Sequence, residues 1–159
     1  MEEGRGIPVN AEDLSVELPI VEDTSLIYDV ELERVTDVKI SVNGVPFFGC
    51  TAIFPDGDYE GMRVQNNYIP TPVKVGPDAT KKERIQAQIR NATFASFAKC
   101  FQLRGAYPVV EHAGDEAGKQ ALKDFVSGVI GNRGKVTVTN GEFPMGSGKL
   151  RSSINSFVY

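Results

Sequence analysis

The segment from Val45 to Ile69 constrains the fold most strongly, because two runs with high strand propensity flank a strong turn signal. The turn at residues 55–58, Pro-Asp-Gly-Asp, combines residue types that preset or tolerate turn dihedral angles. The segment therefore predicts a long β-hairpin. Alternation with a period of two places four side chains of the first arm on one face, which we expect to enter the core: Phe48, Cys50, Ala52 and Phe54.

The second arm of this hairpin divides into an apolar side and a polar side. Such a division is typical of a strand whose one face packs against the core while the other meets water or a polar partner. We expect Met62, Val64 and Tyr68 on the core side, and Arg63, Gln65 and Asn67 on the outer side.

Four further runs have strand character. Residues 26–35 alternate apolar and acidic side chains, and residues 38–42 lead into Asn-Gly at residues 43–44, a strong hairpin signal. Two more strands are expected within residues 134–139 and 149–159.

Two amphipathic helices are predicted between these strands, over residues 80–104 and 115–130. The first begins with Thr80-Lys-Lys-Glu83, which fits a capping box. Apolar residues recur at steps of three and four, as on the buried face of a helix. They are Ile85, Ile89, Ala92, Phe94, Phe97 and Phe101 in the first helix, and Leu122, Phe125, Val126, Val129 and Ile130 in the second.

The length of 159 residues predicts one domain, which we place at residues 25–159 with a helical insertion at about 78–131. Residues 1–24 contain seven acidic residues, one Arg and no aromatic residue, so we expect a flexible arm that the fold does not need. Alternating Val16, Leu18 and Ile20 leave a short edge strand as the alternative.

The charges are divided along the chain. Residues 1–80 hold 15 acidic residues against 5 Lys and Arg, whereas residues 81–159 hold 6 against 12. A polyanionic partner is therefore compatible with the net charge of −4 if the basic residues converge in space, and a solvated helix surface is the alternative.

Catalytic motifs are not apparent in the sequence. The single histidine, His112, is predicted in a loop, and Cys50 and Cys100 lack nearby helper residues, so we expect buried structural thiols. Residues 146–149 lack the full spacing of a phosphate loop. We therefore expect no enzyme activity, no cofactor and no metal. Since neither a membrane span nor a signal peptide is predicted, we expect a cytoplasmic protein.

The remaining pattern is a set of basic, amide and aromatic side chains on the predicted strands. Such residues contact a phosphate backbone and stack on bases. In the last strand, period-two alternation places Phe157 opposite Ile154, so we expect its ring on the outer face. The candidate nucleic-acid-binding residues are Phe47, Arg63, Gln65, Asn67, Lys135, Lys149, Arg151, Asn155 and Phe157.

Three glycine- or arginine-anchored motifs occur in order: G-x-Y-x-G-x-R at 57–63, G-K-V-x-V at 134–138 and R-x-x-I-x-x-F at 151–157. In these motifs the chain resembles a family of short bacteriophage proteins, encoded among replication and recombination genes and thought to be OB-fold single-stranded DNA-binding proteins. The resemblance covers about residues 25–159. It implies a mainly β, OB-like five-stranded barrel with two helices between strands three and four.

The resemblance also implies sequence-tolerant binding of single-stranded DNA in phage replication or recombination, in the host cytoplasm. The alternative is a phage structural or scaffold protein, or a host-protein inhibitor, in which the charge poles drive protein association. We expect the acidic arm to compete with DNA or to bind replication or recombination proteins. Homo-oligomer formation, site size and preference for DNA over RNA are left open by the sequence.

Overall fold

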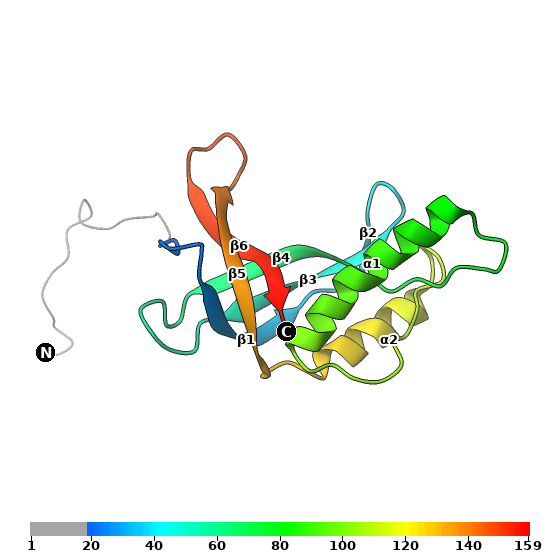
Figure 1. The fold of residues 1–159 in the computed structure, drawn as a ribbon, viewed down its shortest axis with the longest axis horizontal. Helices are drawn as coiled ribbons and strands as arrows, with labels where there is room; N and C mark the ends of the chain where they lie inside the picture. The colour runs from blue at the N-terminus through cyan, green and yellow to red at the C-terminus, as the bar shows by residue number, and fades with distance from the viewer. Residues whose placement is uncertain (1–18) are drawn as a thin grey trace, which may run out of the picture.

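Six strands form one antiparallel β-sheet, and two helices complete an α+β fold (Figure 1). The structure is a computed structural model that describes residues 19–159. Helices α1 (Lys81–Cys100) and α2 (Glu116–Ser127) lie between β4 and β5 in the chain. The strands are β1 (Ile27–Val35), β2 (Lys39–Ile40), β3 (Pro46–Ile53), β4 (Arg63–Pro70), β5 (Arg133–Glu142) and β6 (Leu150–Val158).

Strand pairing follows a path from β4 through β3, β1 and β5 to β6. The two-residue strand β2 pairs with the start of β3. The prediction of a mainly β domain with a helical insertion is confirmed. No ladder joins β4 to β6 within residues 19–159, so this pairing does not form a closed five-stranded barrel.

The inner face of β3 forms the centre of the core, as its alternation predicts. Phe48, Cys50, Ala52 and Phe54 are all buried. Inward side chains of β1, which pairs with β3, and of β5, which pairs with β1, complete this layer, because antiparallel strands present one apolar face. They include Val30, Leu32, Val136 and Val138.

A bulge in the hairpin reverses the alternation of β4. Opposite Gly49 the register of β4 contains two residues, Asn67 and Tyr68. A Cβ atom at position 49 would lie 3.0 Å from the carbonyl oxygen of Asn66, so a glycine allows the strands to approach this closely. The extra residue buries Ile69 and exposes Tyr68. The prediction that Tyr68 lies on the core side is therefore wrong.

A second bulge, in β6, turns an aromatic side chain towards the core instead of exposing it. Val138 pairs with Ile154 and Val136 pairs with Phe157, so β6 has one residue more than β5 between these pairs. Asn155 is exposed there, and Phe157 returns to the same side as Ile154. The prediction that the Phe157 ring lies on the outer face is wrong, because the ring packs against the core.

Helix α1 begins with the predicted capping box. Thr80 Oγ1 accepts a hydrogen bond from the backbone N–H of Glu83, and Glu83 Oε1 accepts one from the N–H of Thr80. Ile85 and Ile89 are exposed, in contrast to their predicted burial, because the N-terminal end of α1 projects beyond the strands (Figure 1). The buried residues of α1 are Ala87, Phe94, Phe97, Ala98 and Cys100.

Helix α2 packs beside β1 and is capped by Asp115, whose carboxylate accepts a hydrogen bond from the N–H of Gly118. Leu122 and Val126 are buried as predicted, whereas Ile130 is exposed. No helix within residues 19–159 is both long and apolar enough to cross a membrane.

The segment before β1 belongs to the folded domain from Val21 onward. Val21 is fully buried, its N–H donates to Ser152 Oγ at 2.8 Å, and its carbonyl accepts from Asn140 Nδ2 at 2.8 Å. The flexible arm was predicted to extend to residue 24, and this prediction is wrong for the residues from Val21 onward. Ile20 lies in no strand, and the remaining arm, residues 1–18, lies outside the described residues.

Candidate nucleic-acid interface

An aromatic pair lies on the outer surface of β3 and β4. The ring centroids of Phe47 and Tyr68 are 4.8 Å apart with an interplanar angle of 36°, and Tyr68 is 46% exposed. We call this pair the aromatic platform. Phe47 is half-buried, and an exposed ring such as that of Tyr68 accepts any base by stacking. The sequence identified Phe47 but not Tyr68, although Gly49 within a strand was a signal for the bulge that exposes Tyr68.

A small cleft between β4 and β6 brings three predicted residues together. Gln65 and Asn67 of β4 and Arg151 of β6 line this space of about 120 Å³, which we call the β4–β6 cleft. The amides and the guanidinium suit base edges and phosphate oxygens, and the carboxylate of Glu142, which also lines the cleft, accepts backbone N–H groups of the β5–β6 loop. The other lining residues are Gly141, Glu142, Phe143 and Ser153.

Arg151 is held over an aromatic ring at one end of this cleft. Its guanidinium carbon lies 5.0 Å from the ring centroid of Phe143, a cation–π geometry. Arg151 forms no ion pair with any residue in the range 19–159. Its charge is therefore not neutralised by a described carboxylate. Phe143 is 55% exposed and was not identified from the sequence.

The β5–β6 loop, residues 143–149, is ordered by one carboxylate. Glu142 accepts hydrogen bonds from the backbone N–H groups of Gly146 at 3.0 Å and Gly148 at 2.9 Å. This arrangement keeps Met145 and the predicted residue Lys149 exposed beside the cleft. The loop thus presents apolar and basic side chains from a fixed backbone.

Two predicted cations are paired with carboxylates of β1. Arg63 contacts Glu33 at 2.7 Å, and Lys135 Nζ lies 2.7 Å from Asp29 Oδ1. The hydrogen bond from Arg63 lowers the pKa of Glu33, and the same bond raises the pKa of Arg63. Both groups therefore stay charged at neutral pH, and the positive charges at Arg63 and Lys135 are largely compensated.

The last two predicted residues do not join this surface as expected. The ring of Phe157 packs edge-on against Phe97 of α1, with 5.5 Å between the ring centroids. Its centroid lies 6.0 Å from that of Phe101, the residue after α1. The ring is therefore partly buried against the core and does not lie on the outer face of the sheet. Asn155 is exposed at the bulge of β6.

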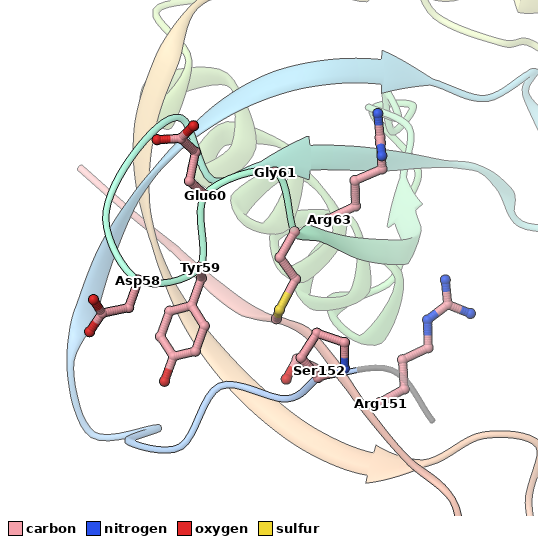
Figure 2. Close-up of a pocket in the computed structure, with 9 residues that line it drawn as sticks. Asp58, Tyr59, Glu60, Gly61, Arg63, Arg151 and Ser152 are labelled. Atoms are coloured by element: carbon pink, nitrogen blue, oxygen red, sulfur yellow. The ribbon is translucent and has the colours of Figure 1, made fainter. Parts of the chain in front are cut away.

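A larger cleft, of about 530 Å³, lies between the β3–β4 turn and β6. Figure 2 shows Arg63 and Arg151 on one side of it, with Asp58 and Glu60 on the turn that closes another side. The two carboxylates disfavour a phosphate here. We therefore end the candidate interface on the arginine side of this cleft, where Arg63 is paired with Glu33.

The thiols and the imidazole give no nucleophile–base pair. Burial raises the pKa of Cys50 to about 12, so this thiol stays protonated. Burial also raises the pKa of Cys100, whose thiol donates to the carbonyl of Lys135 at 3.3 Å. His112 Nδ1 accepts a hydrogen bond from the N–H of Gly114 in an exposed loop.

Comparisons with known proteins find neither a matching family model nor a significantly similar curated protein. Function is therefore inferred from the side chains described above. The part of the chain that the structure describes contains no group of three or more His, Cys, Asp or Glu residues able to hold a metal ion.

Proposed function

We propose that this protein binds single-stranded DNA with little sequence preference. The observation that carries this proposal is the Phe47–Tyr68 platform, with Tyr68 exposed and Phe47 half-buried, which continues along β4 into Gln65 and Asn67 and across the cleft to Arg151. Rings on which bases stack, followed by amides and by a cation that has no ion pair within residues 19–159, are typical of surfaces that bind single strands.

The strand pairing supports the OB-like interpretation of the sheet. If the five longer strands are the barrel strands, the first, β1, pairs with the second, β3, and with the fourth, β5. OB folds are partly open barrels that bind oligonucleotides on strands two and three and with the loops at their ends. In this assignment the platform lies on strands two and three, the β5–β6 loop is the last long loop, and the helices follow strand three.

Stacking should contribute more to the affinity than charge does. Among the predicted cations in residues 19–159, only Arg151, which lines the cleft, and Lys149, in the adjoining loop, have no carboxylate partner there, because Arg63 and Lys135 are paired. For single strands each phosphate contact contributes about −0.7 to the slope of log K against log salt. Two contacts therefore predict a slope of about −1.4.

Fluorescence anisotropy with labelled oligothymidine and mixed-sequence strands tests the proposal at two salt concentrations. Tyr68→Ala should weaken binding about tenfold, within the range expected for one stacked base, while Tyr68→Phe keeps the ring and the affinity. Tyr159→Ala, at an exposed tyrosine outside the interface, is the matched control. Absence of binding by the wild-type protein at low salt would refute the proposal and favour the alternative of protein association.

A further inference from the structure

A second groove lies beside α1, adjacent to the aromatic platform. The extended segment 71–77 directly follows β4 and runs along the first half of α1, leaving a space of about 410 Å³ between them. We call this space the α1 groove. Six of its lining residues combine apolar and basic or amide side chains: Val73, Val75, Lys82, Gln86, Ala87 and Arg90.

The walls of the α1 groove are fixed by side chains of the helix. Asn91 binds both backbone groups of Val73, with its Oδ1 accepting from the N–H at 2.9 Å and its Nδ2 donating to the carbonyl at 3.0 Å. Arg84 donates to the carbonyl of Pro77 at 3.3 Å. The groove is therefore preformed, which lowers the entropic cost of binding a ligand.

Arg90 lines this groove as a partly desolvated cation. Within residues 19–159 Arg90 donates one hydrogen bond, from Nη2 to the carbonyl of Thr71 at 3.1 Å, and its buried Nε has no acceptor. Burial lowers the pKa of Arg90, and the nearby Tyr68 opposes this shift. A guanidinium has five N–H donors, so Arg90 keeps donors for an anionic ligand.

The charge balance of the groove also favours an anion. Lys82 adds a second positive charge to that of Arg90. Glu83 lines the groove as well, but its carboxylate accepts the N–H of Thr80 at the start of α1, and this hydrogen bond lowers its pKa. Its charge is therefore already directed at the helix N-terminus.

We propose that the α1 groove binds the nucleotides that continue past the aromatic platform, with a phosphate at Arg90 and Lys82 and a base against Val73 and Val75. This inference rests on the proposed function, because β4, which carries Tyr68, leads directly into Thr71, whose carbonyl accepts the hydrogen bond from Arg90. It gives the helical insertion a role in binding and makes the binding site longer than the sheet alone.

The length dependence of binding tests this inference. Wild-type affinity should rise with oligothymidine length beyond the strand that covers the sheet, within the range of about 4–16 nucleotides seen for single OB folds. In the double variant Lys82→Glu with Val75→Asp, short strands should bind as before. The longest strands should bind about tenfold more weakly than to the wild type.

A matched control is Lys99→Glu with Ile130→Asp, which makes the same chemical changes at exposed residues outside the groove. Identical length dependence in the groove variant and the wild type would overturn this inference and leave the proposed function intact. If no strand binds the wild type, the proposed function fails as well. If the double variant does not fold, the length dependence of binding is measured for the single variant Lys82→Glu, which changes an exposed residue. The same two outcomes then support or overturn the inference.

Discussion

Arg63 and Glu33 form a bidentate ion pair across the outer face of the sheet, with 2.7 Å between Nε and Oε1 and 2.9 Å between Nη2 and Oε2. Arg63 lies on β4 and Glu33 on β1, with β3 between these strands. The edge of the guanidinium that would bind a phosphate is occupied by the carboxylate. A residue predicted to bind DNA is thus held by an acidic residue of the same surface.

Replacing Glu33 with Gln should strengthen binding of single-stranded DNA. The change frees Arg63 for one further phosphate, so affinity at low salt should rise severalfold and the salt slope should become steeper by about 0.7. Anisotropy titrations at several salt concentrations measure both quantities. Asp124→Asn, which removes one negative charge on α2, is the control, and an equal gain in that variant would mean that only net charge matters.

The stabilisation that Glu33 contributes through this ion pair should decrease at acidic pH. The pKa of Glu33 is lowered in the folded protein, so its contribution to stability is present above the ordinary glutamate pKa of about 4.3 and is lost as the pH falls through the lowered value. Arg63 therefore stays paired at neutral pH. We expect the affinity difference between wild type and Glu33→Gln to be constant from about pH 6 to 8 and to shrink below about pH 4, in titrations at fixed salt.

Phe157→Ala should destabilise the fold, whereas Phe143→Ala should weaken DNA binding. The Phe157 ring is partly buried against Phe97 and Phe101, so its removal should cost about 3 kcal/mol, the lower end for a core phenylalanine. Thermal unfolding should show a drop in Tm of roughly 6–12 °C for a domain of this size. Phe143→Ala should melt like the wild type, and a large fall in its Tm would contradict the assignment of Phe143 to the surface.

Val21→Ala should lower the free energy of unfolding by about 2 kcal/mol, because a fully buried side chain loses two methyl groups. Urea unfolding measures this change. Glu22→Ala, one residue further along, removes an exposed side chain and is the control. Equal stability of the two variants would show that this segment is dispensable, as the sequence alone predicted.

Cys50 should make the protein less stable at alkaline pH. Its pKa is raised to about 12 by burial, so its stabilising effect is complete below the pKa of an unfolded thiol, about 8.5, and is lost as the pH rises towards 12. Between about pH 9 and 10 the wild type should lose about 1.2 kcal/mol more than Cys50→Ala in urea unfolding, because the unfolded thiol is largely deprotonated in this range and the folded thiol is not. Parallel losses in the two proteins would contradict this effect.

Local sequence determined the elements whose signals involve neighbouring residues. The capping box at Thr80 and Glu83 needs only a spacing of three, and the hairpin of β3 and β4 needs only a turn between two alternating runs. The burial of Phe48 and Cys50 likewise follows from the alternation along one strand. The α+β class was predictable for the same reason.

Tertiary structure decided which face each aromatic ring occupies. The bulges opposite Gly49 and at Asn155 insert one residue each, and such an insertion moves the following side chains to the opposite face of the sheet. Tyr68 therefore becomes part of the surface and Phe157 part of the core. A bulge depends on the register with the partner strand, which the periodicity of a single strand does not contain. The pairing of Arg63 with Glu33 is non-local in the same sense, since it joins residues 30 positions apart on strands that β3 separates.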